Sequence, residues 1–150
     1  MGKLNNSPNQ AQADTGLTIE KLENDFWSNP PKDSSSLITR CYELRKKKLQ
    51  DFDLGDFRLL IGQNIGLQFL IPLAIEEIKT NPFVEADFYG GDLLLNILKS
   101  DKKYWESNPE IKRELICIFE SEKAKLINEL DVTEEIRADL FNAYSNFVNG

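Results

Sequence analysis

Any catalytic chemistry in this chain would depend on carboxylates, lysines or cysteines, because its 150 residues include no histidine. Without histidine the chain lacks the commonest general base, the usual catalytic triads and most kinds of zinc site. Two pairs of acids are adjacent, Glu76 with Glu77 and Glu134 with Glu135. Neighbours on a helix point about 100° apart, so the carboxylates of a pair cannot easily share a metal ion or a proton. We interpret both pairs as solvated helix faces.

The two cysteines do not suggest a metal or redox site. Cys41 and Cys117 lie among apolar residues without a CxxC spacing, which predicts two buried free thiols. The sequence also lacks P-loop and GxSxG motifs, and its paired glycines, Gly62 with Gly66 and Gly90 with Gly91, are typical of helix ends. We therefore expect no enzymatic activity, no metal and no cofactor.

A polar loop near the middle of the chain, from Asp87 to Asp92, has two explanations. Its two carboxylates and Tyr89 would offer hydrogen bonds to a basic protein partner. The loop also has a structural explanation, in which Asp92 caps the following helix and Phe88 fills the core. Gln63 and Asn64 likewise either contact a ligand or satisfy backbone groups at a helix end, and for them we favour the structural role.

The segment that must hold these groups is the apolar run from Ile65 to Ile75, in which Gln68 is the only polar residue. A helix there would be apolar on nearly every side and too short to span a bilayer, so we expect a buried central helix. Pro72 should kink this helix, and Asn81 with Pro82 should end it.

Local patterns predict the helices around this run. Asp53 and Asp56, flanked by Phe52 and Phe57, have the spacing of a capped and stapled helix start at Leu54. Gly62 should close that helix in the left-handed conformation, and the chain should re-enter helix near Gly66. Other helices are expected from Thr18 to Trp27, after Ser34–Ser36, from Asn108 and Pro109 to Leu130, and from Asp131 or Thr133 onward.

Because no segment alternates like a strand, we predict an all-α fold, a single compact helical domain of about six to seven helices around a buried central helix. Residues 1–16 are rich in Asn, Gln, Ser and Ala, which predicts a disordered N-terminal tail before a helical domain of residues 17–150. The first residues include no continuous apolar segment, so we expect no secretory signal and a cytoplasmic location.

Two features leave alternatives open. The basic run Arg45–Lys48 is either a nucleic-acid patch or a solvated group that offsets the negative end of a helix, and we favour the second because the run is short and lacks interleaved aromatics. Tyr104 and Trp105, in an expected polar connection from Asp101 to Asn108, are either an exposed anchor for a partner or a lid over the core, and we favour the lid.

The net charge of −7 is unevenly distributed along the chain. Residues 1–50 hold 8 basic and 6 acidic residues (+2), residues 51–100 hold 3 and 8 (−5), and residues 101–150 hold 7 and 11 (−4). Acidic proteins are repelled by phosphate backbones, so we expect no nucleic acid and no membrane as partner. The charge either keeps the protein soluble or attracts a basic protein.

Several motifs of the central region together resemble one family. They are Ile61–Leu67, Leu70–Ala74, Asn81 with Pro82, Asp87–Tyr89 and Gly91–Leu94, within a looser match over roughly residues 17–130. This pattern is similar to that of the contact-dependent growth inhibition (CDI) immunity proteins, small bacterial proteins that neutralise a toxin domain. One departure is Gly90, where members of the family often have proline.

The resemblance implies a helical protein that binds the toxin domain at the C-terminal end of a large cell-surface effector, as a monomer in a one-to-one complex. It also implies structural roles for the motif residues Gly62, Gln63, Asn64, Gly66, Pro72, Asn81, Pro82, Phe88, Gly91 and Asp92. Our candidate toxin contacts are Glu76, Glu77, Glu85, Asp87 and Tyr89. An acidic inhibitor suits a basic toxin, which favours a nuclease. The alternatives are a helical adaptor or regulator of an unrelated protein and a carboxylate hydrolase, which would need two carboxylates with raised pKa values in a deep pocket.

Overall fold

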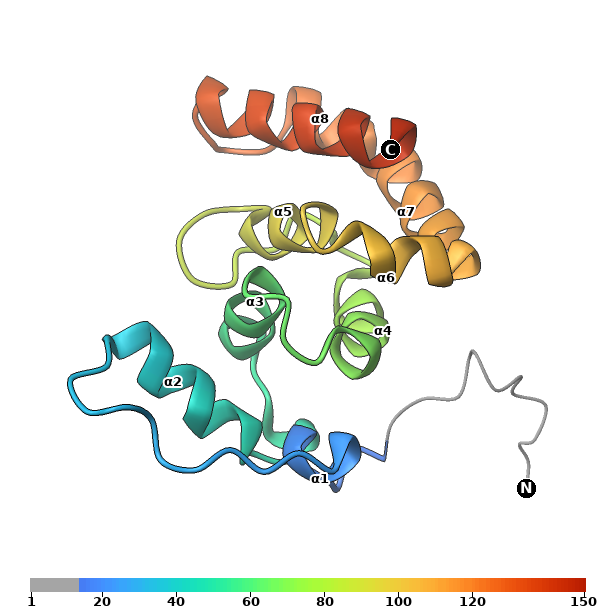
Figure 1. Cartoon of the computed structure of the whole chain (residues 1–150). Helices are drawn as coiled ribbons and strands as arrows, with labels where there is room; N and C mark the ends of the chain where they lie inside the picture. The colour runs from blue at the N-terminus through green and yellow to red at the C-terminus, as the bar shows by residue number, and fades with distance from the viewer. Residues whose placement is uncertain (1–13) are drawn as a thin grey trace. The chain divides into compact units, whose positions relative to one another are not determined.

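All regular structure in residues 14–150, the part of the chain that this computed structural model describes, is helical (Figure 1). This confirms the predicted all-α fold. Two isolated bridges, Thr18 with Lys48 and Glu85 with Gly90, are the only strand-like pairs in that range. The elements are α1 (Ile19–Glu23), α2 (Ser36–Arg45), the 3-10 turn η2 (Leu49–Asp51), α3 (Leu54–Gly62), α4 (Leu67–Ile78), α5 (Asp92–Leu98), α6 (Lys102–Ser107), α7 (Pro109–Asn128) and α8 (Glu134–Asn149).

The described residues form two compact units, one that ends at residue 51 and one of residues 52–150. Residues 1–13 of the expected tail lie outside the described range. The remaining three residues of that expected tail form a turn, in which the carbonyl of Thr15 accepts a hydrogen bond from the Gln50 amide (2.8 Å). The next backbone bond of this pairing joins Leu49 N–H to the carbonyl of Leu17 (3.0 Å), so η2 is held against the segment before α1.

In the first unit, α1 is shorter than predicted. Thr18 caps it as expected, accepting a hydrogen bond from the Lys21 amide (3.3 Å). The helix ends at Glu23 instead of continuing to Trp27, because Asn24 takes the left-handed conformation (φ 54°). Phe26 is consequently exposed (58%). The residues after Asn24 are held instead by hydrogen bonds from α2, as described below.

Helix α2 begins as predicted, with the Ser35 side chain accepting a hydrogen bond from the Ile38 amide (3.2 Å). The prediction that the basic run after it lies in solvent is wrong for Arg45, which is 1% exposed. The guanidinium of Arg45 has partners on the segment after α1, and burial of an arginine requires such partners. The sequence signal was misleading because those partners lie 20 or more residues away.

In the second unit, α3 begins as predicted. Asp53 and Asp56 form a complete capping box, and the rings of Phe52 and Phe57 lie 5.4 Å apart. The predicted left-handed Gly62 is wrong, since the positive φ angles fall at Asn64 (57°) and Gly66 (64°).

Packing explains Gly62 instead, because a Cβ there would lie 2.7 Å from the side-chain amide nitrogen of Asn96. That nitrogen donates to the Arg58 carbonyl (2.8 Å), which ties α5 to α3. The Asn64 side-chain oxygen accepts a hydrogen bond from the Asp101 amide (2.9 Å), whereas the sequence predicted bonds to backbone groups at the helix end itself. Its partner thus lies beyond the local backbone.

Helix α4 contains Pro72 and is the predicted central apolar segment, but it is only partly buried. Leu70, Ile71 and Ile75 are buried, while Leu67 and Phe69 are half-buried. Helix α5 is more completely buried, and it lies between α3 and α8 (Figure 1). Its buried apolar residues are Leu93, Leu94, Leu95, Ile97 and Leu98.

The expected polar connection from Asp101 to Asn108 is helix α6, so the chain has eight α-helices in the described residues rather than the predicted six to seven. Tyr104 and Trp105 are both buried, in agreement with a lid over the core. The indole nitrogen of Trp105 donates to the Ser100 hydroxyl (2.9 Å), and its ring meets that of Phe147 on α8 edge to face (4.8 Å).

Helices α7 and α8 start where the sequence predicted. Pro109 is the first residue of α7, and the Thr133 side chain caps α8 by accepting from the Ile136 amide (3.2 Å). The rings of Phe119 and Tyr144 stack at 3.7 Å and join the two helices. The prediction of two buried thiols is wrong for Cys117, which is exposed because it lies on the outer side of α7.

Candidate functional site

The loop before α5, residues 84–92, is folded around the carboxylate of Asp92. This side chain is 2% exposed and accepts four backbone hydrogen bonds of 2.8–2.9 Å, from Ala86, Asp87, Phe88 and Leu93. The prediction that Asp92 caps the next helix from the position before it is therefore wrong. The helix starts at Asp92 itself, and the carboxylate organises the loop that precedes it.

Burial alone would raise the pKa of the Asp92 carboxyl, but its hydrogen bonds act the other way. The four backbone amides together lower the pKa below its ordinary value, because they stabilise the charged form. Asp92 is therefore ionised at neutral pH. A buried anion with four fixed donors makes the loop a rigid surface feature.

Arg58 of α3 lies against the outer side of this loop. Its Nε donates to the Asp87 carboxylate (2.8 Å), and its guanidinium carbon lies 4.6 Å from the centre of the Phe88 ring. The expectation that Phe88 fills the core is wrong, because this side chain is 70% exposed. Phe83 occupies the core instead, edge to face against Phe119 (5.8 Å).

Gly91 is the residue before α5, and its backbone is left-handed (φ 91°). A Cβ at this position would lie 2.9 Å from a methyl carbon of Leu140 on α8. We expect Gly91→Ala to lower the free energy of unfolding by about 2 kcal/mol, from left-handed strain and displacement of Leu140. Urea denaturation measures the loss.

Gly62→Ala is the comparison for that variant, since Gly62 ends α3 with helical backbone angles and its Cβ would meet only the Asn96 side chain. We expect a loss of about 1 kcal/mol from Gly62→Ala. Equal losses in the two variants would contradict the role of the left-handed backbone at Gly91.

A groove of about 390 Å³ runs beside the loop and is shared with the segment that leads into α8. On the loop side it is lined by Glu85, Phe88 and Tyr89, and on the other side by Asp131 and Ile136. The pKa of Tyr89 is raised, first by burial and then by the Asp92 and Asp139 carboxylates. Tyr89 therefore keeps its proton at neutral pH and remains a hydrogen-bond donor.

The five candidate toxin contacts fall into two groups. Glu85, Asp87 and Tyr89 share the loop, whereas Glu76 and Glu77 lie exposed at the end of α4. Glu76 pairs with Lys79 (2.7 Å), which also approaches Glu114 of α7 (3.9 Å). The structure thus gathers three of the five in one place, and toxin contact by any of them stays a prediction.

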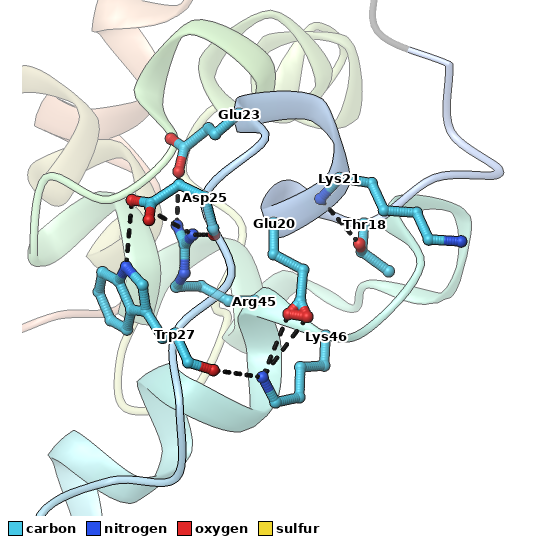
Figure 2. A network of polar contacts seen from close by, with 8 residues as sticks. All are labelled: Thr18, Glu20, Lys21, Glu23, Asp25, Trp27, Arg45 and Lys46. Carbon is cyan, nitrogen blue, oxygen red and sulfur yellow. Dashed lines mark hydrogen bonds and ion pairs between the residues drawn. The ribbon is translucent and has the colours of Figure 1, made fainter.

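Sequence reasoning missed the polar network of the first unit (Figure 2). Arg45 of α2 bonds the Glu23 carboxylate (2.5 Å) and the Asp25 carbonyl, and its guanidinium carbon lies 4.1 Å from the centre of the Trp27 ring. Lys46 adds bonds to the Glu20 carboxylate and the Trp27 carbonyl, both 3.1 Å. The network holds the segment after α1 against α2. It is a structural network, with both cations paired.

Two pockets bear on the hydrolase alternative. The groove with two carboxylates, Glu85 and Asp131, lies at the surface beside the loop. The second pocket, between α5, α6 and α8, contains one carboxylate, that of Asp139. Neither arrangement matches a deep pocket with a carboxylate pair.

Comparison with known proteins identifies the family. The sequence profile of the CDI immunity proteins matches residues 21–115, which run from α1 into the first third of α7 and include the whole Asp92 loop. Searches of curated proteins and of solved structures gave no match. Within residues 14–150, none of the helices is long and apolar enough to cross a membrane. Because the matched residues make up more than half of the chain and contain the motifs of the central region, this protein belongs to the CDI immunity proteins.

Proposed function

We propose that this protein neutralises the toxin domain of its own CDI effector by binding it one to one in the cytoplasm, without turnover. The observation that carries the proposal is the family match over residues 21–115. Inhibition by binding needs a rigid surface and no reactive group. The loop around Asp92 is such a surface, because its backbone is fixed before any partner arrives.

The loop and its groove are the toxin-contacting surface in this proposal. Phe88 is an exposed aromatic side chain, the kind of residue that often dominates interface energies. Glu85, Asp87 and Tyr89 surround it with carboxylates and a hydrogen-bond donor. A stable interface buries about 1,600 Å² in total, so the toxin would also cover neighbouring surface.

The charge of the second unit supports a basic toxin. Residues 52–150 hold 10 basic and 18 acidic residues, a net charge of −8, whereas residues 1–51 hold 8 and 7, a net charge of +1. Charge complementarity accelerates association and excludes wrong partners. A nuclease needs positive charge to hold phosphates, so a nuclease is the toxin that fits this charge best.

Co-expression with the cognate toxin domain tests the function, scored by cell survival and by purification of a one-to-one complex. Survival and complex formation are expected together. Cells that die despite abundant folded protein, with no complex formed, would contradict the proposal. A stable complex with an unrelated protein instead would favour the adaptor alternative.

Phe88→Ala tests the surface within that assay. We expect the dissociation constant of the toxin complex to rise about 30-fold, in the range of an aromatic anchor at an interface. Phe26→Ala is the matched control, since Phe26 is also exposed (58%) but belongs to the other unit. If the two variants bind the toxin with equal affinity, the loop is not the toxin-contacting surface.

Charge variants separate the two groups of candidate acids. Glu85→Gln with Asp131→Asn removes the carboxylates of the groove, and Glu76→Gln with Glu77→Gln removes those of α4. We expect the groove pair to slow association at low salt several-fold more than the α4 pair. An association rate that does not change with salt would exclude recognition led by acids.

A further inference from the structure

A second concave site lies within the unit of residues 52–150, between α5, α6 and α8. It encloses about 410 Å³. Its apolar side chains are Leu95, Leu98, Trp105, Ala143 and Phe147. A volume of a few hundred Å³ with a mainly apolar lining is typical of small-molecule sites.

Most of the charged side chains of this pocket are cationic. Lys99, Lys102 and Lys112 line it together with a single carboxylate, that of Asp139. Three of the ten basic residues of a unit with net charge −8 therefore line one pocket, and with Asp139 the side chains of its lining have a net charge of +2. Because these lysines gather in one pocket of a unit that is otherwise acidic, the pocket favours an anionic ligand.

Two of these lysines are not paired with an acid in the described part of the chain. Over residues 14–150, neither Lys99 nor Lys102 forms an ion pair. Lys112 lies beside the apolar lining, because its ammonium is 5.3 Å from the centre of the Phe147 ring. The same ammonium donates to the Gly150 carbonyl oxygen (3.3 Å), so it already bonds an oxygen acceptor at the pocket. Asn142 and Asn146 add amide donors to the lining.

We propose that this pocket binds a small organic monoanion with an apolar body, a carboxylic acid of medium chain length. The apolar body would lie on Trp105, Ala143 and Phe147, and the carboxylate would face the lysines. Asp139 opposes ligands of higher charge, because its own carboxylate repels them. This pocket shares no lining residue with the groove beside the loop, so the proposal does not rest on the proposed toxin-contacting surface.

Trp105 provides the readout. The chain has two tryptophans, Trp27 and Trp105, so Trp27→Phe leaves only the indole that lines the pocket. Octanoate titrated into this variant is expected to change the fluorescence in a saturable way, and octanamide, its uncharged counterpart, to bind about tenfold more weakly. As a second measurement, octanoate should raise the unfolding temperature of the unmodified chain, since a ligand of the folded state stabilises it.

Neighbouring lysines give the matched control. Lys99→Gln with Lys102→Gln is expected to weaken octanoate binding about tenfold, whereas Lys103→Gln, which lies outside the pocket, should leave it unchanged. Ala143→Leu should weaken octanoate and octanamide alike, because it fills the apolar part. The proposal is overturned if octanoate gives neither signal, if octanamide binds equally well, or if Lys103→Gln has the same effect as the double variant.

Discussion

Asp92→Ala is expected to lower the free energy of unfolding of the second unit by about 3 kcal/mol, the largest single effect that we anticipate. The substitution removes an acceptor for the amides of Ala86, Asp87 and Phe88, which lie together in one loop. These three amides would need new hydrogen-bond acceptors, and the loop would lose its fixed shape. Toxin binding should weaken with it. Trp105 fluorescence during urea denaturation of a Trp27→Phe background follows this unit.

Asp101→Ala is the control for the Asp92 variant. Asp101 is an exposed carboxylate that accepts one hydrogen bond, from the Lys103 amide (3.1 Å), at the start of α6. We expect a loss of about 1 kcal/mol from this ordinary helix cap. If Asp92→Ala costs no more than Asp101→Ala, the loop is not organised by the buried carboxylate.

The Asp92 effect should also depend on pH in a defined direction. The folded-state pKa is lowered below the unfolded value, so the stabilisation is complete above the unfolded pKa and is lost as the pH falls through the folded one. The difference in free energy of unfolding between the wild type and Asp92→Asn should be constant above about pH 5 and shrink below about pH 4. A difference that grows on acidification would contradict the lowered pKa.

Arg45→Ala is expected to have the second largest effect, a loss of about 2 to 3 kcal/mol in the first unit. Arg45 is 1% exposed, and removal of its guanidinium breaks the bonds to Glu23 and Asp25 and the contact with the Trp27 ring (Figure 2). The Glu23 side chain is partly exposed (31%), so water compensates some of the loss. Arg45→Lys should restore little, because one ammonium cannot reproduce the forked contacts of arginine.

Arg40→Ala on the same helix is the control for the Arg45 variant. Arg40 is exposed and pairs with Glu43 one turn away (3.4 Å), an interaction worth about 0.5 kcal/mol or less. Trp27 fluorescence in a Trp105→Phe background reports the unfolding of the first unit. Similar losses from Arg40→Ala and Arg45→Ala would mean that the buried network does not stabilise the segment after α1.

The family and the elements with local signals could be predicted from the sequence. The motifs that suggested the CDI immunity proteins lie inside the matched range of residues 21–115. The helix starts after Thr18, Asp53 and Thr133 were correct because a cap and its partner lie within one turn of each other. The charge distribution also follows from the residues alone.

The candidate site could be predicted only in part. Three of the proposed contacts, Glu85, Asp87 and Tyr89, share one loop partly because they are close in the sequence. The exposure of Phe88 was not predictable, since both Phe83 and Phe88 are suitable core residues and only packing against Phe119 selects the first. The lysine-rimmed pocket combines α5 and α6 with α8, so no local pattern indicates it.

The sequence by itself determined where most helices begin, because a cap and its partner are close along the chain. It also determined the charges and the family, which follow from residue types and motifs. The tertiary structure decided which polar groups meet. Arg45 bonds Glu23, Arg58 bonds Asp87, and Asn64 bonds Asp101. The partners are 22, 29 and 37 residues apart along the chain, respectively. Such pairs form only after the helices have packed, and partners 20 or more residues apart have no fixed spacing that a local sequence pattern could reveal.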